Sequence, residues 1–143
     1  MSSATRSEEE PISPDESVLR LIWGDYFKPG LALSVQPAAF EPHKNDTDGI
    51  SVFRLACLSN PGEALAVIAD GKRERYATVS LPIAELAALG LTVRPDKIAK
   101  VPGHAVVPEL NIESCRADKP RCKTLQKQLA ESASRNIVHR PAK

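Results

Sequence analysis

The residues with the clearest chemical potential lie in an acidic loop before an apolar run. Asp46 and Asp48 are followed directly by Gly49, an order typical of calcium-binding loops. In an EF-hand register Lys44 and Leu55 would occupy the two positions that require carboxylates, so an EF-hand is excluded. The composition favours a turn, because Asp side chains bond to nearby backbone and Gly adopts positive φ. A non-standard cation site at Asp46 and Asp48 is the alternative.

Three histidines are candidate catalytic groups or metal ligands: His43, His104 and His139. His104 stands out because it follows a Pro-Gly pair and begins an apolar run, where a strand edge would aim its side chain. With a carboxylate such as Asp96 or Glu109, it would form a hydrolytic or transferase site. The alternative is that each histidine is structural.

The three cysteines, Cys57, Cys115 and Cys122, are odd in number and too few for a disulfide framework. Reduced thiols in a reducing compartment are therefore expected. Zinc sites usually contain closely spaced pairs of ligands, whereas here only His139 follows Cys122, 17 positions later. Buried or incidental thiols are the better interpretation, and neither a metal nor a cofactor is expected.

A basic segment near the C-terminus is the main candidate binding surface. Residues 1–50 hold four Lys/Arg and nine Asp/Glu, whereas residues 116–143 hold eight Lys/Arg and two Asp/Glu. The candidate binding residues are Lys119, Arg121, Lys123, Lys127 and Arg135. The three lysines recur every four residues, which places them on one helical face. Such a face fits phosphate contacts, a protein contact or plain solvation, and the lack of nearby aromatic residues disfavours single-stranded nucleic acid.

The order of local patterns predicts an α+β domain: a single small mixed sheet of about four to five strands, packed with three to four helices. A Ser-Pro-Asp-Glu start predicts the first helix over 13–23. The other expected helices cover 64–69, 83–89 and 119–134. The expected strands cover 49–58, 72–81, 91–95 and 104–108, and a shorter extended piece follows a turn at Pro29-Gly30. Residues 1–12 are expected to be a disordered tail, 13–113 the core domain, and 114–143 a basic helix and tail.

Several classes of protein are disfavoured. The polar, acidic N-terminus does not resemble a signal peptide, and no apolar run is long enough to span a membrane. A cytoplasmic location is therefore expected, with no membrane partner. The nucleophile-elbow, zinc-protease and phosphate-loop motifs do not occur, which argues against an enzyme.

Three pieces of the sequence resemble a group of small uncharacterised bacterial proteins that share the same motif order. The pieces are AAFxP leading to GISV, then YATV, then ALGLTVxPD ending in PGHAVV, and together they cover roughly residues 18–108. The group carries no established activity, so the resemblance implies no residue roles.

These observations favour a non-catalytic binding or accessory protein that engages another, genomically linked protein, as part of a bacterial defence, toxin-control or assembly module. Nucleic-acid binding through the basic helix is one alternative, and a small hydrolase or transferase with a site around His104 is another. The sequence leaves the oligomeric state open.

Overall fold

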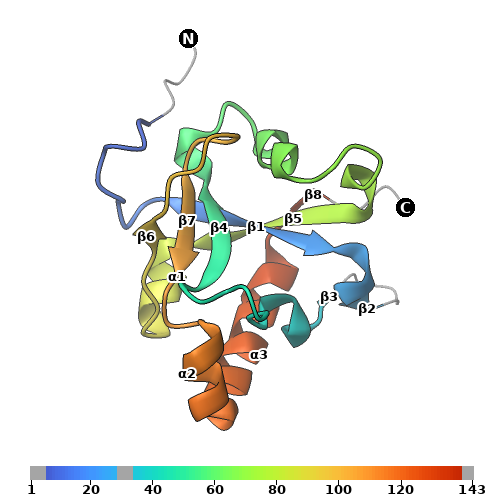
Figure 1. Ribbon diagram of the computed structural model, residues 1–143, viewed down its shortest axis with the longest axis vertical. Helices are drawn as coiled ribbons and strands as arrows, with labels where there is room; N and C mark the ends of the chain where they lie inside the picture. The colour runs from blue at the N-terminus through green and yellow to red at the C-terminus, as the bar shows by residue number, and fades with distance from the viewer. Residues whose placement is uncertain (1–5, 29–33, 140–143) are drawn as a thin grey trace.

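Residues 6–28 and 34–139 are described by a computed structural model, and they form a six-stranded sheet with helices packed against it (Figure 1). The strand order is β6-β7-β4-β1-β5-β8, and every pair is antiparallel. The strands are β1 (Ser17–Trp23), β4 (Ile50–Arg54), β5 (Tyr76–Pro82), β6 (Arg94–Pro95), β7 (His104–Val107) and β8 (Ile137–His139). Two short strands, β2 (Phe27–Lys28) and β3 (Ser34–Val35), pair with each other. The predicted α+β class is confirmed, with antiparallel pairing throughout in place of a mixed sheet.

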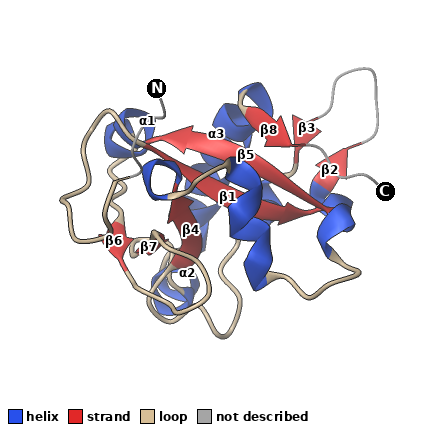
Figure 2. Cartoon of the chain, turned by 90° about the horizontal axis from the view of Figure 1, so that it is seen from above, coloured by secondary structure: helices blue, strands red, loops and turns tan. Residues whose placement is uncertain are grey.

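The described residues also contain three α-helices and five short 3-10 helices (Figure 2). The α-helices are α1 (Ile83–Ala88), α2 (Ile112–Ala117) and α3 (Lys119–Arg135). The 3-10 helices are η1 (Gly24–Tyr26), η2 (Pro37–Phe40), η3 (Leu55–Cys57), η4 (Pro61–Val67) and η5 (Arg73–Arg75). None of the helices in these two ranges is long and apolar enough to cross a membrane.

The first predicted helix, over 13–23, is wrong, because most of this segment is the central strand β1. The local start signal forms only a turn, in which the Ser13 N–H donates to Glu16 Oε2 at 2.8 Å. Beyond that turn, Val18 and Leu19 are both fully buried and point to opposite faces of the sheet. A strand that is covered on both faces has a mostly continuous apolar sequence. The spacing of its apolar residues therefore does not distinguish it from a buried helix.

Two apolar layers enclose the sheet. Val18 belongs to the larger core cluster, which includes residues of α1 and α3, whereas Leu19 packs with Phe53, Leu58 and Val101 in a smaller cluster. Figure 1 shows α2 and α3 below the sheet and the η3–η5 segment above it. The central strands are therefore shielded from water on both sides.

Other elements were predicted with mixed success. The helices over 83–89 and 119–134 are observed as α1 and α3, and Gly90 has the positive φ of 79° expected at the end of α1. Residues 64–67 of the helix predicted over 64–69 lie in the 3-10 helix η4, and 91–95 contributes only a two-residue strand. Strand β8 was not predicted. The predicted Pro29-Gly30 turn lies outside the described residues.

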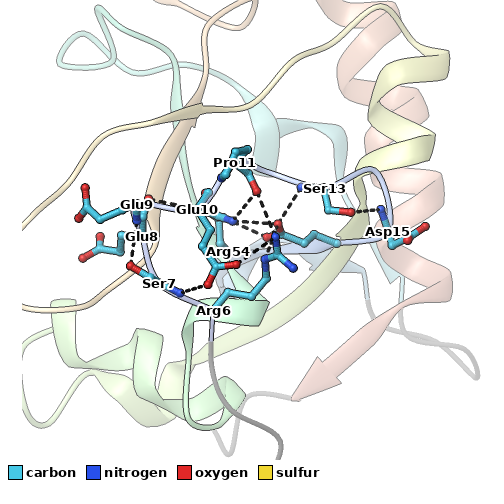
Figure 3. A network of polar contacts seen from close by, with 10 residues as sticks. Arg6, Ser7, Glu8, Glu9, Glu10, Pro11, Ser13, Asp15 and Arg54 are labelled. Atoms are coloured by element: carbon cyan, nitrogen blue, oxygen red, sulfur yellow. Dashed lines mark hydrogen bonds and ion pairs between the residues drawn. The ribbon is translucent and has the colours of Figure 1, made fainter.

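Arg54 is 1% exposed and holds the segment before β1 against the end of β4 (Figure 3). Its guanidinium donates to both carboxylate oxygens of Glu16, from Nε at 2.9 Å and from Nη2 at 2.8 Å. It also donates to the main-chain oxygens of Glu10 and Pro11. In addition, the Gly103 N–H donates to a carboxylate oxygen of Glu8. Residues 8–11 of the expected N-terminal tail therefore contact the sheet and its adjoining loop.

Glu16 is 7% exposed, and its environment favours the charged form. Burial alone would raise the pKa of its carboxyl group, but the bonds from Arg54 and from the Ser13 N–H outweigh burial and lower the pKa. A carboxylate with a lowered pKa stabilises the fold above its ordinary value, and that contribution is lost as the pH falls through the folded-state pKa.

We predict that Glu16→Gln lowers the free energy of unfolding by about 3 kcal/mol near neutral pH, because it leaves the buried Arg54 charge unpaired. Below the ordinary Glu pKa of 4.5 the unfolded wild-type chain takes up a proton at Glu16, and below the lowered folded-state pKa the folded protein also loses this charge. The difference in free energy of unfolding between wild type and Glu16→Gln should therefore become smaller as the pH is lowered. Urea unfolding curves of both proteins, recorded from about pH 7 down to about pH 3, measure this effect.

Glu10→Gln is the matched control, because Glu10 pairs with Arg6 at the protein surface and should change stability by less than about 1 kcal/mol. A Glu16→Gln protein as stable as wild type near neutral pH would show that the buried pair does not hold this segment.

Candidate functional site

Helices α2 and α3 form a capped hairpin that carries most of the basic residues. The Asn111 side chain accepts a hydrogen bond from the Ser114 N–H at 2.8 Å, which caps α2. Asp118 ends α2 and caps α3 by accepting from the Arg121 N–H at 3.2 Å. Pro120 lies in the first turn of α3, where its missing N–H costs nothing. The two side-chain caps and Pro120 therefore determine where both helices begin and keep the connection between them short.

A disulfide joins the two helices of this hairpin, between Cys115 of α2 and Cys122 of α3. The expectation of reduced thiols is therefore wrong for this pair, although Cys57 is a free and buried thiol. The odd total was misleading because only two of the three cysteines meet in the fold. Burial, the largest influence, raises the pKa of the Cys57 thiol, which disfavours a reactive thiolate there.

The hairpin and η2 enclose a groove of about 750 Å³, which we call the basic groove. One wall carries Lys119, Lys123 and Lys127 of α3 together with Arg116 of α2. The opposite wall comes from the η2 segment, with Pro37, Ala38, Glu41 and Pro42, and both disulfide cysteines contribute to the lining. The opposite face of α3, with Leu125 and Leu129, is buried in the main core.

The charge in the basic groove is strongly unbalanced. Its lining contains four basic side chains and one carboxylate, that of Glu41. All four basic side chains are exposed, and none of them forms an ion pair within the described part of the chain. Exposed cations that lack internal partners remain available to an external anion.

The structure thus brings together three of the five predicted binding residues, Lys119, Lys123 and Lys127. Arg121 is exposed but does not line the groove. Arg135 lies at the far end of α3, where its guanidinium is 3.5 Å from the Glu85 carboxylate of α1. Arg116 was missed by the sequence analysis, although its position three residues before Lys119 hinted that it extends the same basic surface.

His104 begins β7 as predicted and is 9% exposed. Its Nδ1 lies 2.6 Å from the main-chain oxygen of Asp96 and 3.4 Å from that residue's carboxylate. Its Nε2 lies 3.1 Å from Ser51 Oγ, a contact that the sequence analysis missed because β4 and β7 are far apart in the chain. Glu109 is not part of this group, because its carboxylate accepts from the Thr92 N–H and hydroxyl.

The acidic loop before β4 is a turn, as its composition predicts. The His43 N–H donates to the Asp46 carboxylate at 2.8 Å, and the Asp46 N–H donates to the His43 carbonyl at 2.8 Å. Gly49 has a φ of 125°, and a Cβ there would lie only 2.3 Å from the Val107 oxygen, so this corner requires glycine. Across residues 6–28 and 34–139, no cluster of three or more His, Cys, Asp or Glu side chains has metal-binding geometry. His139 is in β8, paired with Thr78.

Comparison of the chain with protein-family models, with curated proteins and with solved structures finds no match.

We predict that the unfolded, non-reduced protein has one titratable thiol per chain, because Cys115 and Cys122 are bonded to each other and only Cys57 is free. Reduction should lower the free energy of unfolding by about 2 kcal/mol, since the bridge closes a short loop. Thiol titration in denaturant and urea unfolding with and without reductant measure the two effects.

A Cys57→Ala variant is the control, and it should show no titratable thiol before reduction. Three titratable thiols in the freshly purified wild-type protein would contradict the disulfide.

Proposed function

We propose that the protein is a non-catalytic binding protein whose basic groove receives an acidic segment of another protein. The groove is lined by four exposed basic side chains without ion-pair partners among the described residues, and by a single carboxylate, that of Glu41. An acidic partner supplies the missing negative charge, and such complementarity contributes mainly to specificity and to the rate of association.

The spacing of the lysines favours a partner segment in an extended conformation. Residues four apart on an α-helix are separated by about 6 Å along its axis. Side chains on one face of an extended chain repeat at about 6.6 Å. Lys119, Lys123 and Lys127 can therefore face acidic residues at every second position of an extended peptide. The proline and alanine side chains of the other wall offer an apolar surface to the intervening residues.

The disulfide bears on where this binding takes place. The cytoplasmic location was expected from the polar N-terminus and the lack of a long apolar run, and reduced thiols were expected separately. Disulfides persist mainly in oxidising compartments. The Cys115–Cys122 bridge therefore supports an oxidising environment for the protein. It also links the two helices that carry the basic wall, so the shape of the groove depends on its presence.

We predict that a labelled peptide of alternating glutamate and alanine binds the protein and that added salt weakens the complex. The triple variant Lys119→Glu, Lys123→Glu, Lys127→Glu should lose at least about tenfold in affinity, because attraction becomes repulsion. Fluorescence anisotropy titrations measure both effects. A peptide with the same composition but with its glutamates in one block should bind more weakly.

The matched control is the variant Lys44→Glu, Lys72→Glu, Lys100→Glu, which makes the same change in net charge at exposed lysines outside the groove. It should bind the alternating peptide nearly as well as wild type. If both variants lose the same affinity for the peptide, the loss comes from the change in net charge and not from the groove. Tighter binding of a labelled single-stranded or duplex DNA than of the peptide would replace this proposal by the nucleic-acid alternative.

A second candidate function is a serine hydrolase centred on Ser51. Its support is the serine–histidine contact of 3.1 Å together with the Asp96 carboxylate near the other imidazole nitrogen, an arrangement that resembles a nucleophile, base and acid in series. The binding function is preferred because the closest partner of His104 Nδ1 is a main-chain oxygen at 2.6 Å, and not the carboxylate. The imidazole also packs edge-on against Phe53 in the smaller core.

We predict that a fluorophosphonate probe does not label the native protein, because Ser51 and His104 serve as a structural contact between β4 and β7. Intact mass spectrometry after incubation with the probe measures this. Labelling that disappears in Ser51→Ala and in His104→Ala, in proteins that still unfold cooperatively, would establish the hydrolase instead.

A further inference from the structure

A cavity of about 330 Å³ beside β1 collects a distinctive set of aromatic residues. The chain contains one Trp and two Tyr, and all three of them, Trp23, Tyr26 and Tyr76, line this cavity. The Trp23 and Tyr76 rings meet edge to face, with their centroids 5.1 Å apart. Aromatic rings with a polar group are suited to hold a planar ligand while bonding to its polar edge.

Arg20 supplies positive charge to the same cavity. Its guanidinium donates to the Ala39 oxygen from Nε and Nη2, and to the Ser51 oxygen from Nη1 at 2.8 Å. Of the five N–H groups of an arginine, two therefore have no partner in the described ranges. No carboxylate of these residues lies within ion-pair distance of Arg20. Burial, the largest influence, lowers the pKa of Arg20, and the more distant Asp46 charge partly opposes this effect.

The cavity exists because β4 separates from β1. Strand β1 pairs with β5 along its whole length but with β4 only at Val18 and Leu19. Beyond these residues the bond from Arg20 to the Ser51 oxygen bridges the two strands. The cavity lies along this part of β1, and the exposed His43 side chain also lines it. Arg20 is partly exposed, so its two spare donors are accessible to an anion that enters the cavity alongside the aromatic residues.

We propose that this cavity binds a small aromatic anion, a carboxylate or phosphate carried on a single ring. The anion accepts charge-assisted hydrogen bonds from the remaining Nη1 and Nη2 hydrogens of Arg20. The ring lies among the three aromatic side chains. The volume of the cavity, at the lower end of the range for ligand pockets, fits one ring and one anionic group.

The test uses the fluorescence of Trp23, the only tryptophan of the chain, with phenyl phosphate and benzoate as probes. Saturable quenching by either probe is expected. Neutral benzyl alcohol should give none, and inorganic phosphate should bind more weakly than phenyl phosphate. Arg20→Gln should weaken the affinity by about tenfold or more, the effect of losing charge-assisted hydrogen bonds. The absence of saturable quenching by both aromatic anions in the wild-type protein would overturn the proposal.

Arg75→Gln is the matched control, because the Arg75 guanidinium lies 5.9 Å from the centre of the Trp23 ring but does not line this cavity. It should bind phenyl phosphate with the wild-type affinity. The triple variant Lys119→Glu, Lys123→Glu, Lys127→Glu of the basic groove should do the same. If Arg75→Gln and Arg20→Gln weaken the affinity for the probe equally, the probe does not bind in this cavity. If Arg20→Gln does not fold, His43→Ala is the alternative, because it changes an exposed side chain. It should weaken phenyl phosphate binding. An unchanged affinity would contradict binding in this cavity.

Discussion

The buried pair of Arg54 and Glu16 is the interaction on which the arrangement of the sheet depends. It lies at the junction of β1 and β4, where Val18 pairs with Arg54. The pair joins the N-terminal segment to the two central strands. A buried arginine is costly unless its donors are satisfied, and here they are satisfied by the segment that leads into β1. The same interaction therefore fixes where β1 begins and holds residues 8–11 against the sheet.

The second constraint is the disulfide-linked hairpin of α2 and α3. Its apolar face completes the main core, while its basic face lies opposite η2 across the groove. Three lysines at intervals of four residues would be a solvated stripe on an isolated helix. The wall formed by η2 converts that stripe into one side of a groove, and this is why the proposed partner is an extended acidic segment.

The segment from Pro37 to His43 connects the two candidate sites. Pro37 and Ala38 line the basic groove, whereas Ala39 and His43 line the cavity beside β1 that also contains Arg20. Arg20 holds this segment through the Ala39 oxygen. Because a ligand of Arg20 and a peptide in the groove would contact neighbouring residues of one short segment, the two proposed binding events share a structural element. Coupling between them requires that this segment has two arrangements with different affinities.

The sequence by itself determined the features that depend on neighbouring residues: the α+β class, α1 with its terminal Gly90, α3, and the turn at Gly49. Caps, positive φ and helical spacing are local properties, so the chain displays them without its fold. Only the tertiary structure decided that 17–23 is a strand, that Cys115 meets Cys122, and that Arg20 lines one cavity with Trp23, Tyr26 and Tyr76. These depend on contacts between distant segments, whose burial free energy exceeds the small differences in local propensity that the sequence reveals.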